Sequence, residues 1–274
     1  MPNQVIYRGY ATPADVNIFG DWTSSTALDA KTRKLLYFAE KEVERYCGRS
    51  FVISTDTKEY EGDSTTILKV DDLISVTTLA IDDVAVDSSY IFLYPENVYP
   101  KDEIRLYDAL FTKPIDDYQN ISITGLWGYQ HEAPTTGTAD SGTTSTLVDD
   151  ALTQVDDYWN DYMLTITAGT NAGETRCITD FVASSDTITI DASTPFLKAI
   201  DNTSVYAINR VPSDIRLATA RIALNMARPR ASGTIMDVRG ERINELSVQY
   251  FSSQFKFIDA EIAEILDNYR LVSF

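Results

Sequence analysis

Side chains capable of catalysis are scarce in this sequence, and none falls in a pattern that defines an active site. His131 is the only histidine, and it follows Tyr129 and Gln130 at the start of a polar stretch. A serine or cysteine nucleophile needs a neighbouring base, and no second histidine is there to supply one. The sequence also lacks the glycine-flanked serine of hydrolases and the glycine-rich loop that binds phosphates. We therefore predict a protein that is not an enzyme and has no bound cofactor.

Adjacent aspartates recur along the chain and are the residues best suited to hold a cation. The pairs are Asp71-Asp72, Asp82-Asp83, Asp116-Asp117, Asp149-Asp150 and Asp156-Asp157. Calcium loops instead place acids at alternate positions and end on a glutamate. Because the pairs lie between predicted strands, where aspartate favours turns, we predict turns there and no metal site. A glycosidase with two carboxylates stays an open alternative, since its acids converge only in the folded chain.

Aromatic and arginine side chains indicate contact surfaces. Trp22, Trp127 and Trp159 could stack on sugars, although tryptophan more often anchors a core or an interface. Arginines gather in one region of an otherwise acidic chain: Arg210, Arg216, Arg221, Arg228, Arg230, Arg239 and Arg242. They either form ion pairs within the chain or contact acids on a neighbour. Four of them are our predicted inter-subunit residues: Arg228, Arg230, Arg239 and Arg242.

Three segments have the spacing of amphipathic helices. The first covers residues 29–49, with Gly48 as the expected C-terminal stop signal. Its apolar stripe consists of Leu28, Leu35, Leu36, Ala39, Val43 and Tyr46. The second begins at Pro212 with Ser213 as its cap and ends before Pro229. The third covers about residues 258–270, and its stripe consists of Ile258, Ile262, Ile265, Leu266 and Tyr269.

Short runs with period-2 alternation predict strands between the first two helices. Turn residues separate the runs at 51–53, 58–60, 66–70, 74–81, 90–94, 104–107 and 121–127, which we interpret as a small antiparallel β-meander. Residues 135–146 are almost entirely Thr, Gly, Ser, Ala and Asp, which predicts a flexible polar linker.

More strand-like runs follow the predicted linker, at 163–167, 175–178, 187–190 and 205–208. Residues 169–173 (GTNAG) predict a hairpin loop between the first two. We predict that residues 135–209 form an all-β module inserted into a domain made of residues 1–134 and 210–274. The predicted fold class is α+β: a helical core, a β-meander and the inserted module.

The charge balance restricts how the chain can meet nucleic acid. Its 274 residues include 41 acidic and 23 basic ones, a formal net charge of −18. A protein that grips phosphates needs basic surface, so direct binding of nucleic acid is not expected. An acidic wall past which DNA slides stays compatible with this charge, as does a simple gain in solubility or an adaptation to salt.

Compartment signals are few. Cys47 and Cys177 lie far apart and predict no disulfide framework. Residues 1–10 lack the apolar run of a signal peptide, and no window approaches a membrane span. We therefore expect synthesis in a cytoplasm and no membrane partner.

Four segments carry a resemblance to a known family. They are residues 39–51 (AEKEVERYCGRSF), 71–76 (DDLISV), 121–129 (ISITGLWGY) and 211–218 (VPSDIRLA). In order and spacing they resemble the head–tail connector, or adaptor, family of tailed bacteriophages, over residues 27–132 and 210–270. The insertion departs from the family pattern. With residues 169–176 (GTNAGETR), it looks like a small β-module found in other phage virion proteins.

The resemblance implies a structural protein of the virion neck. It implies a homo-oligomeric ring, usually of twelve copies, that docks on the portal protein, continues the DNA channel and receives a stopper or tail-terminator protein. Portal contacts in the family commonly involve the C-terminal region, which implies Ile258, Ile262, Ile265, Leu266, Tyr269, Leu271 and Phe274 here.

We expect the C-terminal tail to become ordered only on docking. Deleting residues 257–274 should abolish portal binding and leave the monomer folded. Two alternatives remain. One is another virion structural protein, for tail completion or decoration, and the other is a carbohydrate-binding or carbohydrate-cleaving β-protein.

Overall fold

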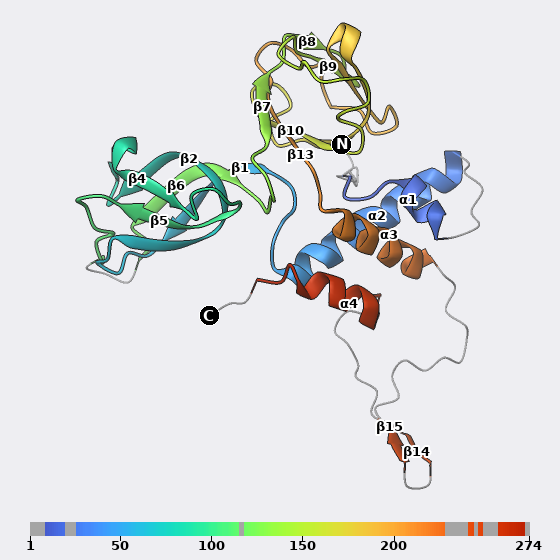
Figure 1. Cartoon of the computed structure of the whole chain (residues 1–274), viewed down its shortest axis with the longest axis horizontal. Coiled ribbons are helices and arrows are strands. Elements are labelled where there is room, and N and C mark those ends of the chain that lie inside the picture. Colours follow the sequence, from blue (N-terminus) through green and yellow to red (C-terminus); the bar gives the residue numbers. More distant parts are fainter. Residues whose placement is uncertain are drawn as a thin grey trace. The chain divides into compact units, whose positions relative to one another are not determined.

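The computed structural model describes residues 9–19, 26–114, 118–227, 241–243, 246–248 and 257–271 (Figure 1). Of residues 26–29, 241–243 and 246–248 it describes the backbone alone. The chain divides into two compact units, one of Met1–Gly48 with Ser213–Phe274 and the other of Arg49–Pro212. The predicted α+β class is confirmed, because antiparallel sheets of six and seven strands accompany four α-helices in the described residues.

Helices α1 (Pro13–Ile18), α2 (Thr26–Cys47), α3 (Ser213–Ala227) and α4 (Ala260–Asp267) make up the helical unit. The last three confirm the predicted helices, with α2 ending directly before Gly48. Helix α1 was not predicted, although its start carries a sequence signal. Thr12 and Asp15 form a capping box around Pro13, and each side chain accepts the other residue's backbone N–H. A backbone hairpin of β14 (Glu241–Ile243) and β15 (Leu246–Val248) also falls within this unit.

Helix α3 lies at the centre of the helical unit, in contact with α1, α2 and α4 (Figure 1). Small residues let neighbours approach it on almost every side, and its buried residues are Ile215, Ala218, Thr219, Ala220, Ile222, Ala223 and Leu224. The buried face of α2 is rotated from the predicted stripe. Thr32, Glu40 and Cys47 are buried there, while Leu35 and Tyr46 are only half-buried.

The six-stranded sheet contains β1 (Ser54–Tyr60), β2 (Ile67–Ile81), β3 (Val84–Ala85), β4 (Ile91–Tyr94), β5 (Lys101–Leu106) and β6 (Ile121–Trp127). Its order is β1-β6-β2-β5-β4, with β3 paired to β2. The predicted meander is therefore wrong, since β6 separates the sequence neighbours β1 and β2. Strand β6 buries every second residue and takes a central place, whereas the polar strand β1 takes an edge.

Strand β2 is one strand of 15 residues, where two strands and a turn at Asp71-Asp72 were predicted. Its first half pairs with β5 and its second half with β6, and the β5 pairing shifts register between Lys69 and Leu73. The aspartate pair thus marks a bulge and not a turn. Residues 51–53, also predicted as a strand, lie outside the sheet. The predicted turn at Asp82-Asp83 is confirmed, because it joins β2 to β3 with positive φ at both residues.

The seven-stranded sheet contains β7 (Thr135–Thr138), β8 (Ser141–Gly142), β9 (Thr146–Val148), β10 (Met163–Ala168), β11 (Thr175–Val182), β12 (Thr187–Ile190) and β13 (Val205–Asn209). Its order is β7-β13-β10-β11-β12-β9-β8. The predicted flexible linker over residues 135–146 is wrong, because β7 and β8 lie within it and β9 begins at its last residue. Threonine favours extended backbone. Pairing with β13 fixes β7 as a strand, and composition alone does not indicate that pairing.

This sheet closes on itself into a small barrel. Its two outermost strands, β7 and β8, are consecutive in the chain and are joined through Ala139 and Asp140. The Ala139 N–H donates to Ser204 O on one side, and the Asp140 N–H donates to Val148 O on the other. The link through Ala139 and Asp140 thus joins the two ends of the strand order. The predicted boundaries of a separate module stay a prediction, because residues 49–212 form one contact unit.

Candidate functional site

The apolar stripe predicted for portal contact lies mostly inside the helical unit. Ile262 and Leu266 are fully buried, Ile258 and Tyr269 are nearly so, and Ile265 is half-buried. Leu271 stays 38% exposed, and Phe274 lies outside the described residues. Most of the stripe therefore stabilises this chain's own fold, and Leu271 is its most accessible described member.

The C-terminal segment is bound to the two long helices by polar contacts as well. The Leu271 N–H donates to Cys47 O, and the Tyr269 hydroxyl donates to Asp214 at 2.7 Å. Deleting residues 257–274 would remove these bonds and two fully buried side chains. The structure does not support the expectation that such a truncation leaves the monomer folded.

The described arginines of the 210–242 region are engaged within the chain. Arg216 Nε donates to Asp15 at 2.8 Å, and Arg221 pairs with Glu261 at 2.8 Å. The Arg210 guanidinium lies 5.6 Å from the centre of the Tyr162 ring. The four predicted inter-subunit arginines are not brought together: Arg228, Arg230 and Arg239 lie outside the described residues, and of Arg242 only the backbone is described.

The residues considered for catalysis or sugar binding do not converge among the described side chains. His131 is exposed and packs edge-on against Tyr129, with ring centres 5.2 Å apart. Trp127 and Trp159 are core residues, 2% and 4% exposed, so they offer no stacking surface to a sugar. Trp22 lies outside the described residues.

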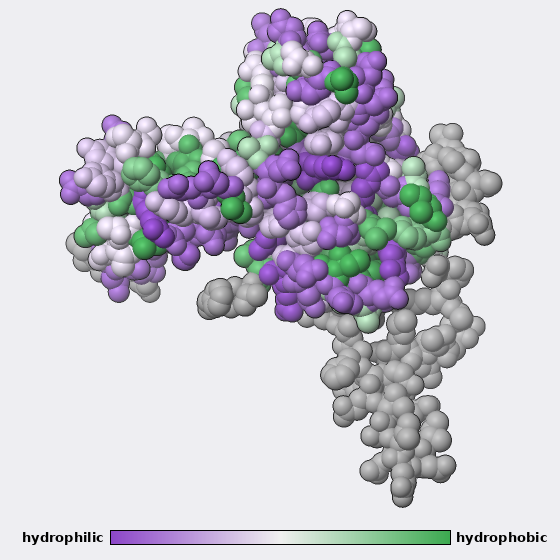
Figure 2. Space-filling model, in the orientation of Figure 1, coloured by the Kyte–Doolittle hydropathy of each residue, from purple (hydrophilic) through white to green (hydrophobic). Residues whose placement is uncertain are grey.

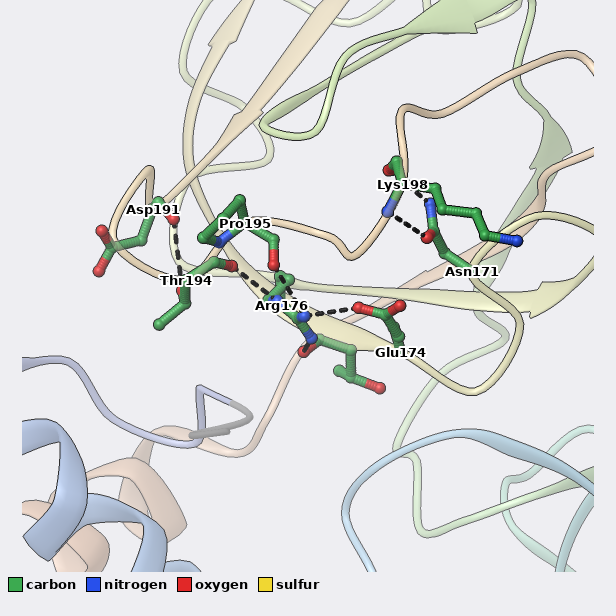
Figure 3. Close-up of polar contacts among 8 residues, drawn as sticks. Asn171, Glu174, Arg176, Asp191, Thr194, Pro195 and Lys198 are labelled. Carbon is green, nitrogen blue, oxygen red and sulfur yellow. Dashed lines mark hydrogen bonds and ion pairs between the residues drawn. The ribbon is translucent and has the colours of Figure 1, made fainter. Parts of the chain in front are cut away.

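A buried arginine organises the polar contacts of the barrel, and Figure 3 shows its surroundings. Arg176 on β11 is 2% exposed. It donates to Thr194 O at 2.7 Å, to Pro195 O at 3.0 Å and to Glu174 at 2.6 Å. Burial lowers the pKa of Arg176, and the neighbouring Glu174 carboxylate opposes that shift. The side chain therefore ties the 191–198 loop to the β10–β11 hairpin.

The predicted hairpin loop at residues 169–173 is confirmed, and it binds the same long loop. Asn171 exchanges two hydrogen bonds with the backbone of Lys198, at 2.9 and 3.0 Å (Figure 3). The Thr170 hydroxyl donates to Asp201 at 2.8 Å. This polar cluster, which includes the GTNAGETR segment, has a structural role in the barrel, because its hydrogen bonds hold the hairpin loop against residues 198–201.

Three acids of the barrel could share a cation. The carboxylates of Asp140, Asp149 and Asp150 have oxygens that all lie within 4.8 Å of one another. Asp149 is buried and already accepts the hydroxyl of Tyr206 at 2.6 Å, and burial together with this bond raises the pKa of that hydroxyl. The Asp150 N–H donates to Asp140. Asp149 and Asp140 thus already accept hydrogen bonds from groups of the barrel itself. The cluster of acids by itself therefore defines no metal site.

Charge is divided unequally between the two units. Met1–Gly48 and Ser213–Phe274 together hold 14 acidic and 14 basic residues. Arg49–Pro212 holds the remaining 27 acidic and 9 basic residues, a balance of −18. The whole net charge of the chain thus belongs to the β-strand unit.

Neither a protein-family model nor a curated protein sequence matches this chain. None of the described helices is long and apolar enough to cross a membrane.

One exposed surface was not predicted from the sequence: the outward face of β4 and its neighbours. Residues 90–94 read Tyr-Ile-Phe-Leu-Tyr, apolar or aromatic on both faces of the strand. In a strand with one face in solvent, apolar and polar residues should alternate. The lack of polar residues in this run therefore indicated an exposed aromatic face.

Proposed function

We propose that this chain is a structural protein of a tailed-phage neck, where it forms an adaptor ring between the portal and a stopper or tail-terminator protein. The ring continues the DNA channel, and the chain has no catalytic role. Residues 135–209 act as a module inserted into the adaptor core of residues 1–134 and 210–274.

One observation carries the proposal. Helix α2 from the first part of the chain and helices α3 and α4 from the last part form a single unit, and all strands of the two sheets lie between them in sequence. The resemblance to the adaptor family implies this layout, with an N-terminal helix, a small β-region and a closing set of helices.

The distribution of charge supports the same proposal. Phosphates are repelled by an acidic surface, so DNA can move past the β-strand unit without adhering to it. The helical unit has equal numbers of acids and bases, so a partner such as the portal can pack against it without that repulsion.

Co-sedimentation with the portal protein encoded beside this chain, followed by negative-stain imaging, tests the proposal. We expect a ring on the narrow end of the portal. A chain that binds no portal across several salt concentrations would point instead to a tail-completion or decoration protein, and binding or cleavage on a glycan array would point to the carbohydrate alternative.

A matched pair of variants locates the contact. Leu271→Asp places a charge on the accessible C-terminal position, and Leu217→Asp places the same charge on α3 at nearly equal exposure, 39% against 38%. We expect Leu271→Asp to weaken portal binding at least ten-fold and Leu217→Asp to leave it unchanged. Equal binding by both variants would exclude the C-terminal contact but not the ring.

A further inference from the structure

The outward face of strands β4, β5 and β2 exposes a group of aromatic and basic side chains. We call it the aromatic face, and it consists of Ile67, Lys69, Tyr90, Phe92, Tyr94, Arg105 and Tyr107. Phe92 is 46% exposed and Tyr107 is 67% exposed. Ile91 and Leu93, on either side of Phe92 in the strand, pack against the core. In Figure 2, apolar residues interrupt the hydrophilic surface over this sheet.

Contacts across the strands hold the aromatic face in place. Phe92 and Ile67 are the register partners of Arg105 on its two sides. The rings of Tyr90 and Tyr107 stack at 6.4 Å with an angle of 5° between their planes, and the Arg105 guanidinium lies 4.1 Å from the Tyr94 ring centre. A preorganised surface loses little side-chain entropy when it binds, which favours recognition.

The chemistry of this face is that of a hydrogen-bond donor surface. Three tyrosine hydroxyls, Arg105 and Lys69 can all donate. Glu103 is the one acid set among them, and its ion pairs with Lys69 (2.7 Å) and with Arg105 lower its pKa. Tyrosine, phenylalanine and arginine are enriched in protein interfaces. Counted together with Glu103, Lys69 and Arg105 leave this face a net charge of +1 on a unit whose balance is −18, so its complement is a surface rich in carboxylates.

The barrel of the same chain is such a surface. Residues 135–209 include 11 acidic and 2 basic residues, and one of these bases, Arg176, is buried. Among the acids exposed in the described barrel are Asp140, Asp150, Asp156, Asp157 and Asp161. Each copy of the chain therefore carries both a donor-rich face and a carboxylate-rich one.

We propose that the aromatic face of one copy binds the acidic barrel surface of a second copy. The contact joins two different surfaces, and repetition of such a contact closes a ring when the rotation between neighbours allows it. The inference rests on the proposed adaptor function and names the contact between neighbouring subunits.

Site-specific photo-cross-linking on the full chain tests the contact. A purified Phe92→benzoyl-phenylalanine variant is mixed with isotope-labelled wild-type chain, alone and on the portal, and the linked peptides are identified by mass spectrometry. We expect links to residues 135–209 of the labelled copy. Links confined to portal peptides, to another part of the chain or to the same copy would overturn the proposal.

Charge variants give a second, independent measurement by analytical ultracentrifugation and by counting subunits on the portal. Phe92→Asp and Arg105→Glu should weaken self-association at least ten-fold. Val84→Asp, 69% exposed on the β2–β3 hairpin, and Lys113→Glu, in an exposed loop, are the matched controls and should associate normally. Circular dichroism verifies that all four variants fold.

The outcomes separate this contact from the adaptor role. Wild-type rings that also form with Phe92→Asp and Arg105→Glu would overturn the contact and leave the adaptor role intact. Self-association through the aromatic face without any portal binding would support the contact and contradict the adaptor role.

Discussion

Glu40 is a fully buried carboxylate that holds the first described segment of the chain against α2. Its Oε1 accepts the backbone N–H groups of Gly9 at 2.9 Å and Tyr10 at 3.0 Å. A buried N–H without an acceptor is costly, which explains why a charged residue occupies the buried face of an amphipathic helix.

We expect Glu40→Ala to lower the free energy of unfolding by about 2–4 kcal/mol, because two buried donors lose a charged acceptor. Urea denaturation measures the change. Glu40→Gln retains an oxygen acceptor and should lose less, and Glu264→Ala, at an exposed position of α4, should have little effect. Equal losses for Glu40→Ala and Glu264→Ala would contradict this role of Glu40.

Asp72 should make stability depend on pH. Burial raises its pKa, and the Arg49 guanidinium, 3.5 Å away, only partly opposes that rise. The folded chain therefore retains the proton to higher pH than the unfolded chain, whose aspartate pKa is about 3.9. The stability contributed by Asp72 falls as pH rises from that value through the raised folded pKa.

Asp72→Asn cannot ionise, so its stability relative to the wild type should increase as pH rises from about 4 through the raised pKa of Asp72. Thermal unfolding at several pH values measures this difference. A difference that is constant with pH, or that changes in the opposite direction, would show that burial does not govern this carboxyl.

At the scale of elements, the β10–β11 hairpin loop contains a matched pair of glycines. Gly169 and Gly173 both have positive φ, 76° and 85°. An added Cβ at Gly169 would lie 1.7 Å from Thr203 O, whereas at Gly173 it would meet nothing within 4 Å. The two positions therefore separate backbone strain from steric overlap.

We expect Gly173→Ala to cost about 1 kcal/mol, from backbone conformation alone. Gly169→Ala should cost roughly 2–4 kcal/mol, because the 199–204 segment must also move away from the hairpin. Chemical denaturation of both variants gives the comparison, and similar losses would mean that the loop yields to the added methyl group.

Patterns within one element predicted that element well. The alternation of residues 121–127 and 187–190 predicted β6 and β12 with the bounds that the structure has. The β7–β9 region escaped prediction because its residues resemble a linker by composition, and their order comes from β13 and β12, far away in sequence. A local sequence pattern does not predict which distant segments pair.

At the scale of the whole molecule, the net charge of the β-strand unit should make it sensitive to salt. It contains 27 acidic and only 9 basic residues, so its carboxylates repel one another. Salt screens this repulsion beyond about 8 Å at physiological ionic strength. The helical unit, with 14 of each, has little net repulsion to screen.

We expect calorimetry to show that the unfolding temperature of the β-strand unit rises between 0.02 and 0.2 M sodium chloride by more than that of the helical unit. Sucrose at equal osmolality is the control, because it should stabilise both units by exclusion and not by screening. An equal response of the two units to salt would contradict the effect of charge segregation.

The partner of an apolar helix stripe could not be predicted from the sequence. Ile262 and Leu266 were correctly placed on one stripe of a helix, but a stripe does not reveal whether it meets its own chain or another. The structure assigns both to the core of the helical unit, and it exposes instead Phe92 and Tyr107, which no motif had distinguished.

The sequence by itself determined the α+β class, the three longer helices, the position of most strands and an acidic balance unsuited to gripping phosphate. These follow from short-range periodicity, caps and composition. Only the tertiary structure decided the strand order, the closure of the barrel through Ala139 and Asp140, the burial of the α4 stripe and the segregation of charge. Each of these depends on which distant segments meet, and that choice is made by hydrophobic burial over the whole chain.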